Sequence, residues 1–215
     1  MKRILSLLVI AVSLQVNAQK IEPKFSYNLE LGLPNAAVNE PYKDIMQGLV
    51  SVAMFGQYSF PFHLNVGAGA RYSLFTVNEF SVPDELYGQI HSAGGFVKIG
   101  YDKFHTERFA TDIGIKIGYG QNIINTDLNE ESGVGSVKVN SSFVEPGIGF
   151  ILSVDQWNSF RLHVGYNIMG YGFRPQLLGL TSDEAWDPGD YDKLTQAFVI
   201  GFGYTYYFNK DKPRD

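Results

Sequence analysis

A strict two-residue alternation of apolar and polar side chains recurs along most of this chain. From Phe62 to Leu74, every even position is apolar and every odd position is polar or glycine. Successive side chains of a strand point to opposite faces, so this segment predicts a strand that is apolar on one face and polar on the other. It exceeds the roughly 9–11 residues that a tilted strand needs to cross a bilayer. Several such strands predict a barrel in a membrane, with its apolar face outward.

The same pattern predicts eight strands. They fall at about 25–33, 49–60, 62–74, 89–101, 109–120, 142–154, 160–173 and 196–208. Pro146 lies inside the sixth and lacks a backbone N–H, which predicts a bulge or a locally broken ladder. The connections alternate between long and short, with the first tight one around Pro61, as is typical of outer-membrane barrels. The predicted fold is all-β: an eight-stranded, antiparallel, up-and-down transmembrane barrel whose two termini are both periplasmic.

The N-terminus has the pattern of a secretory signal peptide. Lys2 and Arg3 form a positive region, an apolar run follows from 4 to 12, and Val16-Asn17-Ala18 matches a cleavage site. The predicted organisation is a signal peptide at 1–18, one barrel domain at 19–208 and a short charged periplasmic tail at 209–215.

Composition excludes several classes of function. The chain has no Cys, so it forms no disulfide and has neither a thiol nucleophile nor a Cys-ligated zinc site. It has 17 basic and 22 acidic residues, and removing the signal takes away two of the basic ones. This balance argues against a nucleic-acid-binding surface.

A soluble barrel of the lipocalin type is the main structural alternative, with the apolar face lining a cavity. Strand length favours the membrane barrel, as do aromatic residues near the strand ends, which form girdles at bilayer interfaces.

Three features resemble small eight-stranded outer-membrane barrel proteins, particularly those of Bacteroidota. They are the signal ending Val16-Asn17-Ala18-Gln19, the alternating strands, and the closing segment from Phe202 to Phe208. The resemblance covers nearly all of the mature chain. It implies a location in the outer membrane and contact with its lipid, with lipopolysaccharide and with other outer-membrane proteins. Members of such families usually end at the terminal aromatic residue, whereas this chain continues to Asp215.

The polar face of the strands predicts a network inside the barrel, because buried charges are tolerated only when they are paired. Its candidate members are Glu30, His63, Arg71, Lys98, Asp112, Lys116, Glu145, Arg161 and His163. An eight-stranded barrel has room inside for side chains but not for an open channel. We therefore expect a polar plug, with a gated pore or a proton path as the alternative.

The last long loop carries clustered carboxylates around a tryptophan and is a candidate contact or cation site. Its candidate residues are Asp183, Glu184, Trp186, Asp187, Asp190 and Asp192. Their spacing does not match an EF-hand, so we assign no metal. Trp186 with Leu177, Leu178 and Leu180 gives this loop an apolar component, which suggests a lid.

His91-Ser92 is the only adjacent His–Ser pair. Some eight-stranded barrels are lipid A deacylases with a His-x-Ser pattern, but adjacent strand residues point to opposite faces. We therefore expect no enzyme and no cofactor. The leading hypothesis is a non-enzymatic structural or accessory subunit of an outer-membrane assembly for secretion, uptake or barrel insertion. Surface adhesion or ligand binding through the outer loops is the second, and a lipid-modifying enzyme is the third.

Overall fold

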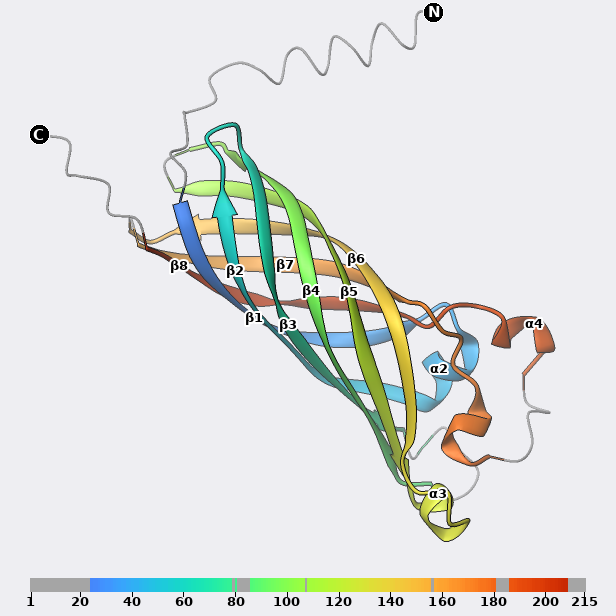
Figure 1. The fold of residues 1–215 in the computed structure, drawn as a ribbon. Helices are drawn as coiled ribbons and strands as arrows, with labels where there is room; N and C mark the ends of the chain where they lie inside the picture. The colour runs from blue at the N-terminus through green and yellow to red at the C-terminus, as the bar shows by residue number, and fades with distance from the viewer. Residues whose placement is uncertain are drawn as a thin grey trace, which may run out of the picture.

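Eight strands close into one antiparallel barrel in the computed structural model of the chain (Figure 1). The structure describes residues 24–78, 80, 86–106, 108–155, 157–180 and 186–208. Each strand pairs with the next along the chain, and β8 pairs with β1. The prediction of an eight-stranded up-and-down barrel is therefore confirmed. The predicted signal peptide and the 209–215 tail lie outside the described residues.

The two ends of the barrel differ. The strands are β1 (Lys24–Ala37), β2 (Met46–Ser59), β3 (Leu64–Val77), β4 (Gly88–Phe104), β5 (Phe109–Thr126), β6 (Val137–Ser153), β7 (Asn158–Met169) and β8 (Gln196–Tyr207). Short helices lie in the long connections that follow β1, β5 and β7: α2 (Glu40–Ile45), α3 (Asp127–Glu131), the 3-10 helix η1 (Pro175–Leu178) and α4 (Pro188–Tyr191). They mark the long-loop end, and the short connections form the opposite, tight-turn end (Figure 1). None of the helices in the described part of the chain is long and apolar enough to cross a membrane.

The apolar face of the strands is outside. Phe62, Leu64 and Val66 have 59%, 41% and 43% of their surface exposed, which excludes the lipocalin arrangement. We call this face of the barrel the outer apolar band. The strands are 12 to 18 residues long, more than the roughly 9–11 residues that a tilted strand needs to cross a bilayer. Aromatic rings cluster at the tight-turn edge of this band, where the Phe25 and Phe208 ring centroids lie 5.5 Å apart.

Beyond this band, at the long-loop end, the alternation inverts. On β4, Gln89 points outward while Ile90 is buried in the lumen, and on β5 Asn125 points outward while Ile124 is buried. A polar outer face over an apolar inner face is the pattern of a sheet that faces water on its outer side. This inversion is why the fifth strand was predicted to stop at 120 but runs to Thr126. The seventh was predicted to reach 173, but β7 ends at Met169, so that boundary is wrong.

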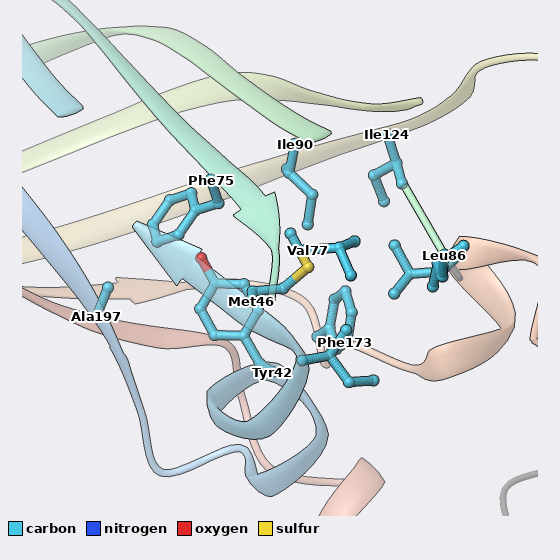
Figure 2. Packing of buried hydrophobic residues seen from close by; sticks show 11 residues of the cluster. Tyr42, Met46, Phe75, Val77, Leu86, Ile90, Ile124, Phe173 and Ala197 are labelled. Atoms are coloured by element: carbon cyan, nitrogen blue, oxygen red, sulfur yellow. The ribbon is translucent and has the colours of Figure 1, made fainter. Parts of the chain in front are cut away.

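An apolar cap closes the lumen at the long-loop end (Figure 2). It consists of Tyr42, Ile45, Met46, Phe75, Val77, Leu86, Ile90, Ile124, Phe173, Leu178 and Ala197. The Tyr42 ring from α2 packs between Phe75 and Phe173, with ring centroids 5.3 Å from each. The sequence predicted an apolar contribution from the last long loop, and Leu178 of that loop belongs to the cap. It did not predict the cap residues from the strands and from α2.

The hairpin between β2 and β3 shows that one predicted strand boundary is wrong. The third strand was predicted to begin at Phe62, but β3 begins at Leu64. The His63 N–H donates to the Phe60 carbonyl at 3.0 Å, and His63 has a φ of 71°. A turn that closes with a left-handed residue is a common three-residue hairpin loop. His63 is therefore part of the turn.

Pro146 breaks one ladder locally, as predicted. The β6–β7 pairs are Val144 with Ile168 and then Gly147 with Gly165, so the register is kept across the gap. On its other side Pro146 pairs with Ile115. The only register shift between the described strands lies on β2, between Gly48 and Val50.

Candidate functional site

Seven of the nine predicted interior residues form one continuous chain of ion pairs inside the barrel. In order along the chain they are Arg71, Glu145, Lys116, Glu30, Arg161, Asp112 and Lys98. Five of the six contacts lie between 2.6 and 2.8 Å, and the Arg161–Glu30 contact is 3.4 Å. We call this set the ion-pair chain. Cations and anions alternate along its length, and both of its ends are cations, Arg71 and Lys98.

The strands place these seven side chains in the lumen because each occupies an inward position of the two-residue alternation. Lys98 and Lys116 are direct cross-strand neighbours on β4 and β5, which places two positive charges side by side. Each turns to a different acid: Lys98 Nζ lies 2.7 Å from Asp112, and Lys116 Nζ lies 2.6 Å from Glu30. The repulsion between neighbouring lysines is offset by carboxylates from other strands.

Glycines leave space for the side chains of the ion-pair chain, and aromatic rings enclose them. A Cβ on Gly149 would lie 3.1 Å from Arg161 Cδ, so the arginine stem passes directly over that glycine. Arg71 Cζ lies 4.4 Å from the centre of the Phe143 ring, a cation–π contact that replaces part of the hydration it loses. Phe143 packs with Phe55 and Phe96 in a small interior cluster that the sequence pattern did not reveal.

An eighth ionisable residue, Asp102, lies next to the ion-pair chain on its tight-turn side and is linked to Lys98 through Gln57. It is 5% exposed, and its Oδ2 accepts from Gln57 Nε2 at 3.4 Å and from Ser59 Oγ at 3.3 Å. Gln57 also accepts from Lys98 Nζ at 2.8 Å. Asp102 was missed from sequence because the fourth strand was predicted to end at residue 101. Lys98 and Gly100 both point inward, so extending the predicted strand by one more inward position would have included Asp102.

The two histidines predicted in this network do not join it as pairing partners. His63 belongs to the β2–β3 turn, with its ring centroid 5.7 Å from that of Tyr101. Its prediction as a network member is wrong, because the strand does not reach it. His163 is buried beside the network, but its Nδ1 has no hydrogen-bond partner among the described residues.

The lumen is filled where the ion-pair chain lies. A cavity of about 30 Å³ is lined by Glu30, Lys116 and Arg161 among others, with room for about two water molecules. A second, of about 10 Å³, lies between Arg71 and His163. Cavities of this size have room for single water molecules but not for a larger solute.

No protein-family model matches the chain, and no curated protein matches it in sequence. Among solved structures, it is similar to neisserial surface protein A, with 12% identity over 86% of this chain and 97% of that one, at a TM-score of 0.55. It is also similar to Ail of Yersinia pestis (12% identity, 86% and 100% covered, TM-score 0.48) and to OprG of Pseudomonas aeruginosa (12% identity, 87% and 98% covered, TM-score 0.47).

The fold is that of the eight-stranded outer-membrane barrels. At 12% identity, the similarity to neisserial surface protein A establishes the architecture alone. What the barrel does has to be argued from its own residues.

The described parts of the last long loop, 170–180 and 186–195, lie over the apolar cap and are hydrogen-bonded to the other loops. Asn39 Nδ2 donates to the Lys193 carbonyl at 2.9 Å and to the Phe173 carbonyl at 3.2 Å. Thr126 Oγ1 donates to the Leu178 carbonyl at 2.9 Å, and Trp186 packs against the cap. The loop is thus a lid held by hydrogen bonds.

The predicted acidic residues of this loop are spread over separate contacts. The Trp186 indole N–H donates to Asp44 at 3.1 Å, Asp190 pairs with Lys193 at 2.7 Å, and Asp192 lies 3.9 Å from Arg174. Asp187 precedes α4 without a side-chain capping bond. Asp183 and Glu184 lie outside the described residues. The described residues contain no group of acids and histidines with metal-binding geometry.

His91 and Ser92 lie on opposite sides of the wall. His91 Nδ1 lies 2.8 Å from the Tyr72 hydroxyl, on the outer face. Ser92 lines a lumen cavity with Arg71 and Asn122. A nucleophile and its base have to be within hydrogen-bond reach of each other, so these two residues do not form a catalytic pair.

Proposed function

We propose that this chain is a non-enzymatic integral outer-membrane protein that acts by contact, as a structural or accessory subunit of a larger outer-membrane assembly for secretion, uptake or barrel insertion. The main support is the occupied lumen: the ion-pair chain fills its middle, and the apolar cap closes its long-loop end. A barrel that is blocked twice is poorly suited to transport. The outer wall and the lid are then the surfaces through which the protein contacts other molecules.

We also infer how the barrel is oriented in the outer membrane. Outer-membrane barrels place short turns in the periplasm and long loops outside. The long-loop end of this barrel would then face the exterior, with both chain ends periplasmic. The outer apolar band contacts membrane lipid, and the polar outward residues above it, such as Gln89 and Lys138, lie at the level of lipopolysaccharide sugars.

Crosslinking from single cysteines tests the contact role. The chain has no Cys, so each introduced thiol reacts alone. Ala70→Cys and Ile117→Cys report on two parts of the wall, and Val134→Cys reports on the loops. We expect one position to give a defined adduct of stoichiometric yield in intact cells while the others give none. Monomer at every position, in cells and in mild detergent, would contradict a subunit role.

A second candidate is surface binding through the lid, favoured by its hydrogen-bonded attachment to the other loops. Loops on a rigid scaffold commonly carry recognition. Replacing the exposed Arg174, Asp187 and Asp192 by serine leaves the cap residues in place. Loss of cell-surface binding with unchanged barrel stability would support this candidate, and retained binding would remove it.

The absence of enzymatic activity is part of the proposal. Mass spectrometry of lipid A and phospholipids after incubation with the purified barrel should show no new species. A deacylated or acylated product would assign a lipid-modifying activity instead.

A further inference from the structure

Asp102 and Asp112 face each other across β4 and β5 near the tight-turn end of the lumen. They are directly paired in register, and they are 5% and 4% exposed. The Asp102 N–H donates to the His63 carbonyl at 2.8 Å, so the backbone polar groups of Asp102 point toward β3. Toward β5 the pair is therefore non-hydrogen-bonded, the arrangement in which Cα atoms lie about 4.5 Å apart and side chains are closest.

The two carboxylates are unequally neutralised. Asp112 Oδ2 accepts from Lys98 Nζ and from Arg161 Nη1, each at 2.7 Å. Asp102 Oδ2 accepts only the two long bonds from the neutral side chains of Gln57 and Ser59, and it makes no ion pair with another described residue. Two adjacent buried carboxylates do not both ionise without compensation. Asp112 is the member that the surrounding cations hold in the charged form.

Four buried polar atoms around this pair lack a hydrogen-bond partner among the described residues. They are Asp102 Oδ1, Asp112 Oδ1, Asn65 Oδ1 and Asn65 Nδ2. Asn65 is 0% exposed. A Cβ on Gly100 would lie 2.7 Å from Asn65 Oδ1 and 3.1 Å from Asp112 Oδ1, so both oxygens converge over that glycine. Buried polar atoms are normally paired, so a group of orphans in one place indicates a bound species.

We propose that Asp102 and Asp112 bind one proton between them, carried on Asp102 Oδ1 and donated to Asp112 Oδ1, with the buried Asn65 amide beside them. The proton gives both orphan carboxyl oxygens a partner. A metal cation fits this place poorly, because Lys98 and Arg161 already place two positive charges against Asp112. The tight-turn end of the lumen thus contains a proton-binding site.

Charged and titratable groups reach the pair from several strands. Lys98 of β4 and Arg161 of β7 contact Asp112, and Arg161 also contacts Glu30 of β1. Tyr207 of β8 lies close to Asp102, and His63 binds its backbone from the turn. The side chains that reach Asp102 from β2, Gln57 and Ser59, are neutral. Loss of the proton would place a second negative charge beside Asp112, and the two nearest cations, Lys98 and Arg161, already contact Asp112.

Infrared spectroscopy of the folded barrel tests the proposal directly. At pH 7, wild-type protein should show a C=O band of a protonated carboxyl group, and Asp102→Asn should abolish it. Glu131→Gln, at an exposed position of α3, should leave the band unchanged. Absence of the band in wild type, or its persistence in Asp102→Asn, would overturn the proposal. A band that appears only after sodium and calcium are removed would assign the site to a metal cation instead, which also overturns it.

Urea unfolding in detergent gives a second readout. Above about pH 4 an unfolded Asp releases its proton. The folded barrel then binds one proton more than the unfolded chain. The equilibrium constant for unfolding therefore rises by up to about tenfold per pH unit, until the folded pair also releases its proton. Asp102→Asn should fold and lack this component, because an amide replaces the neutral acid. Parallel pH profiles, or a failure of Asp102→Asn to fold, would contradict a shared proton.

Discussion

Lys116 Nζ and Glu30 Oε2 lie 2.6 Å apart although they stand on β5 and β1, which are opposite strands of the closed eight-stranded barrel. A single ion pair therefore spans the lumen. Lys116 also contacts Glu145 of β6 at 2.8 Å, so one ammonium group joins three strands. The charged side chains therefore connect opposite walls of the barrel through ion pairs. This pairing explains why so small a barrel tolerates many buried charges.

Removing Lys116 should destabilise the barrel strongly. Lys116→Met keeps the apolar stem and leaves Glu30 and Glu145 without this cation. Breaking a buried ion pair by removing one partner costs about 3–5 kcal/mol. Urea unfolding followed by gel mobility would measure the loss. Lys138→Met, at an exposed outward position of β6, is the matched control and should change stability little. Equal effects of the two substitutions would refute a bridging role.

The outer apolar band predicts a depth-dependent response to charge. Ile117 lies in the band on β5 and is 45% exposed in the isolated barrel. Ile117→Arg should destabilise the folded protein in lipid vesicles by about 2–4 kcal/mol, whereas Asn140→Arg, above the band, should cost about 0–1 kcal/mol. Similar values at the two positions would mean that the band does not meet hydrocarbon.

The lid should loosen when Asn39 is shortened. Its Oδ1 accepts from the Tyr42 N–H at 3.0 Å at the start of α2, and its Nδ2 donates to the last long loop. Loss of such a cap costs about 1 kcal/mol. Limited proteolysis of Asn39→Ala should show faster cleavage between 170 and 195 with an intact barrel. Trp186→Phe removes the indole N–H that donates to Asp44 and keeps an aromatic ring against the cap, so it should be cleaved at nearly the wild-type rate. The reverse order would show that Asn39 does not hold the lid.

The β6–β7 turn should respond to acid. Hydrogen bonds from the Asn158 side chain and the Trp157 N–H hold the pKa of the Asp155 carboxyl below its ordinary value of 3.8. The turn therefore gains stability above that value and loses it as the pH falls through the lower folded-state pKa. An NMR titration should show this depressed pKa, and Asn158→Ala should raise it toward 3.8. An unchanged titration in the variant would rule out this cause.

Much of the wall was predictable from sequence, for a physical reason. A strand in a bilayer has to be apolar on one face along its whole crossing, so the alternation located every crossing and the seven inward residues of the ion-pair chain. The partners of those charges were not predictable. Glu30 and Lys116 are 86 positions apart, and only closure of the barrel brings them together.

The regions beyond the bilayer were the least predictable. Outside the membrane the apolar face turns inward, so the pattern that identified the strands no longer marked their ends. The cap residues Tyr42, Phe173 and Leu178 come from long connections without periodicity. Asp102 was missed because it follows the last outward aromatic residue of its strand, Tyr101, where the prediction stopped.

Ion conductance across a planar bilayer tests the central claim, that the lumen is closed, most directly. With the purified barrel inserted, we expect no unit conductance above the lipid background over the full range of applied voltage, both for wild type and for Asn39→Ala, in which the ion-pair chain is intact. Regular single-channel steps from wild-type protein would show that the lumen conducts, and would contradict a barrel closed by its ion-pair chain and its apolar cap.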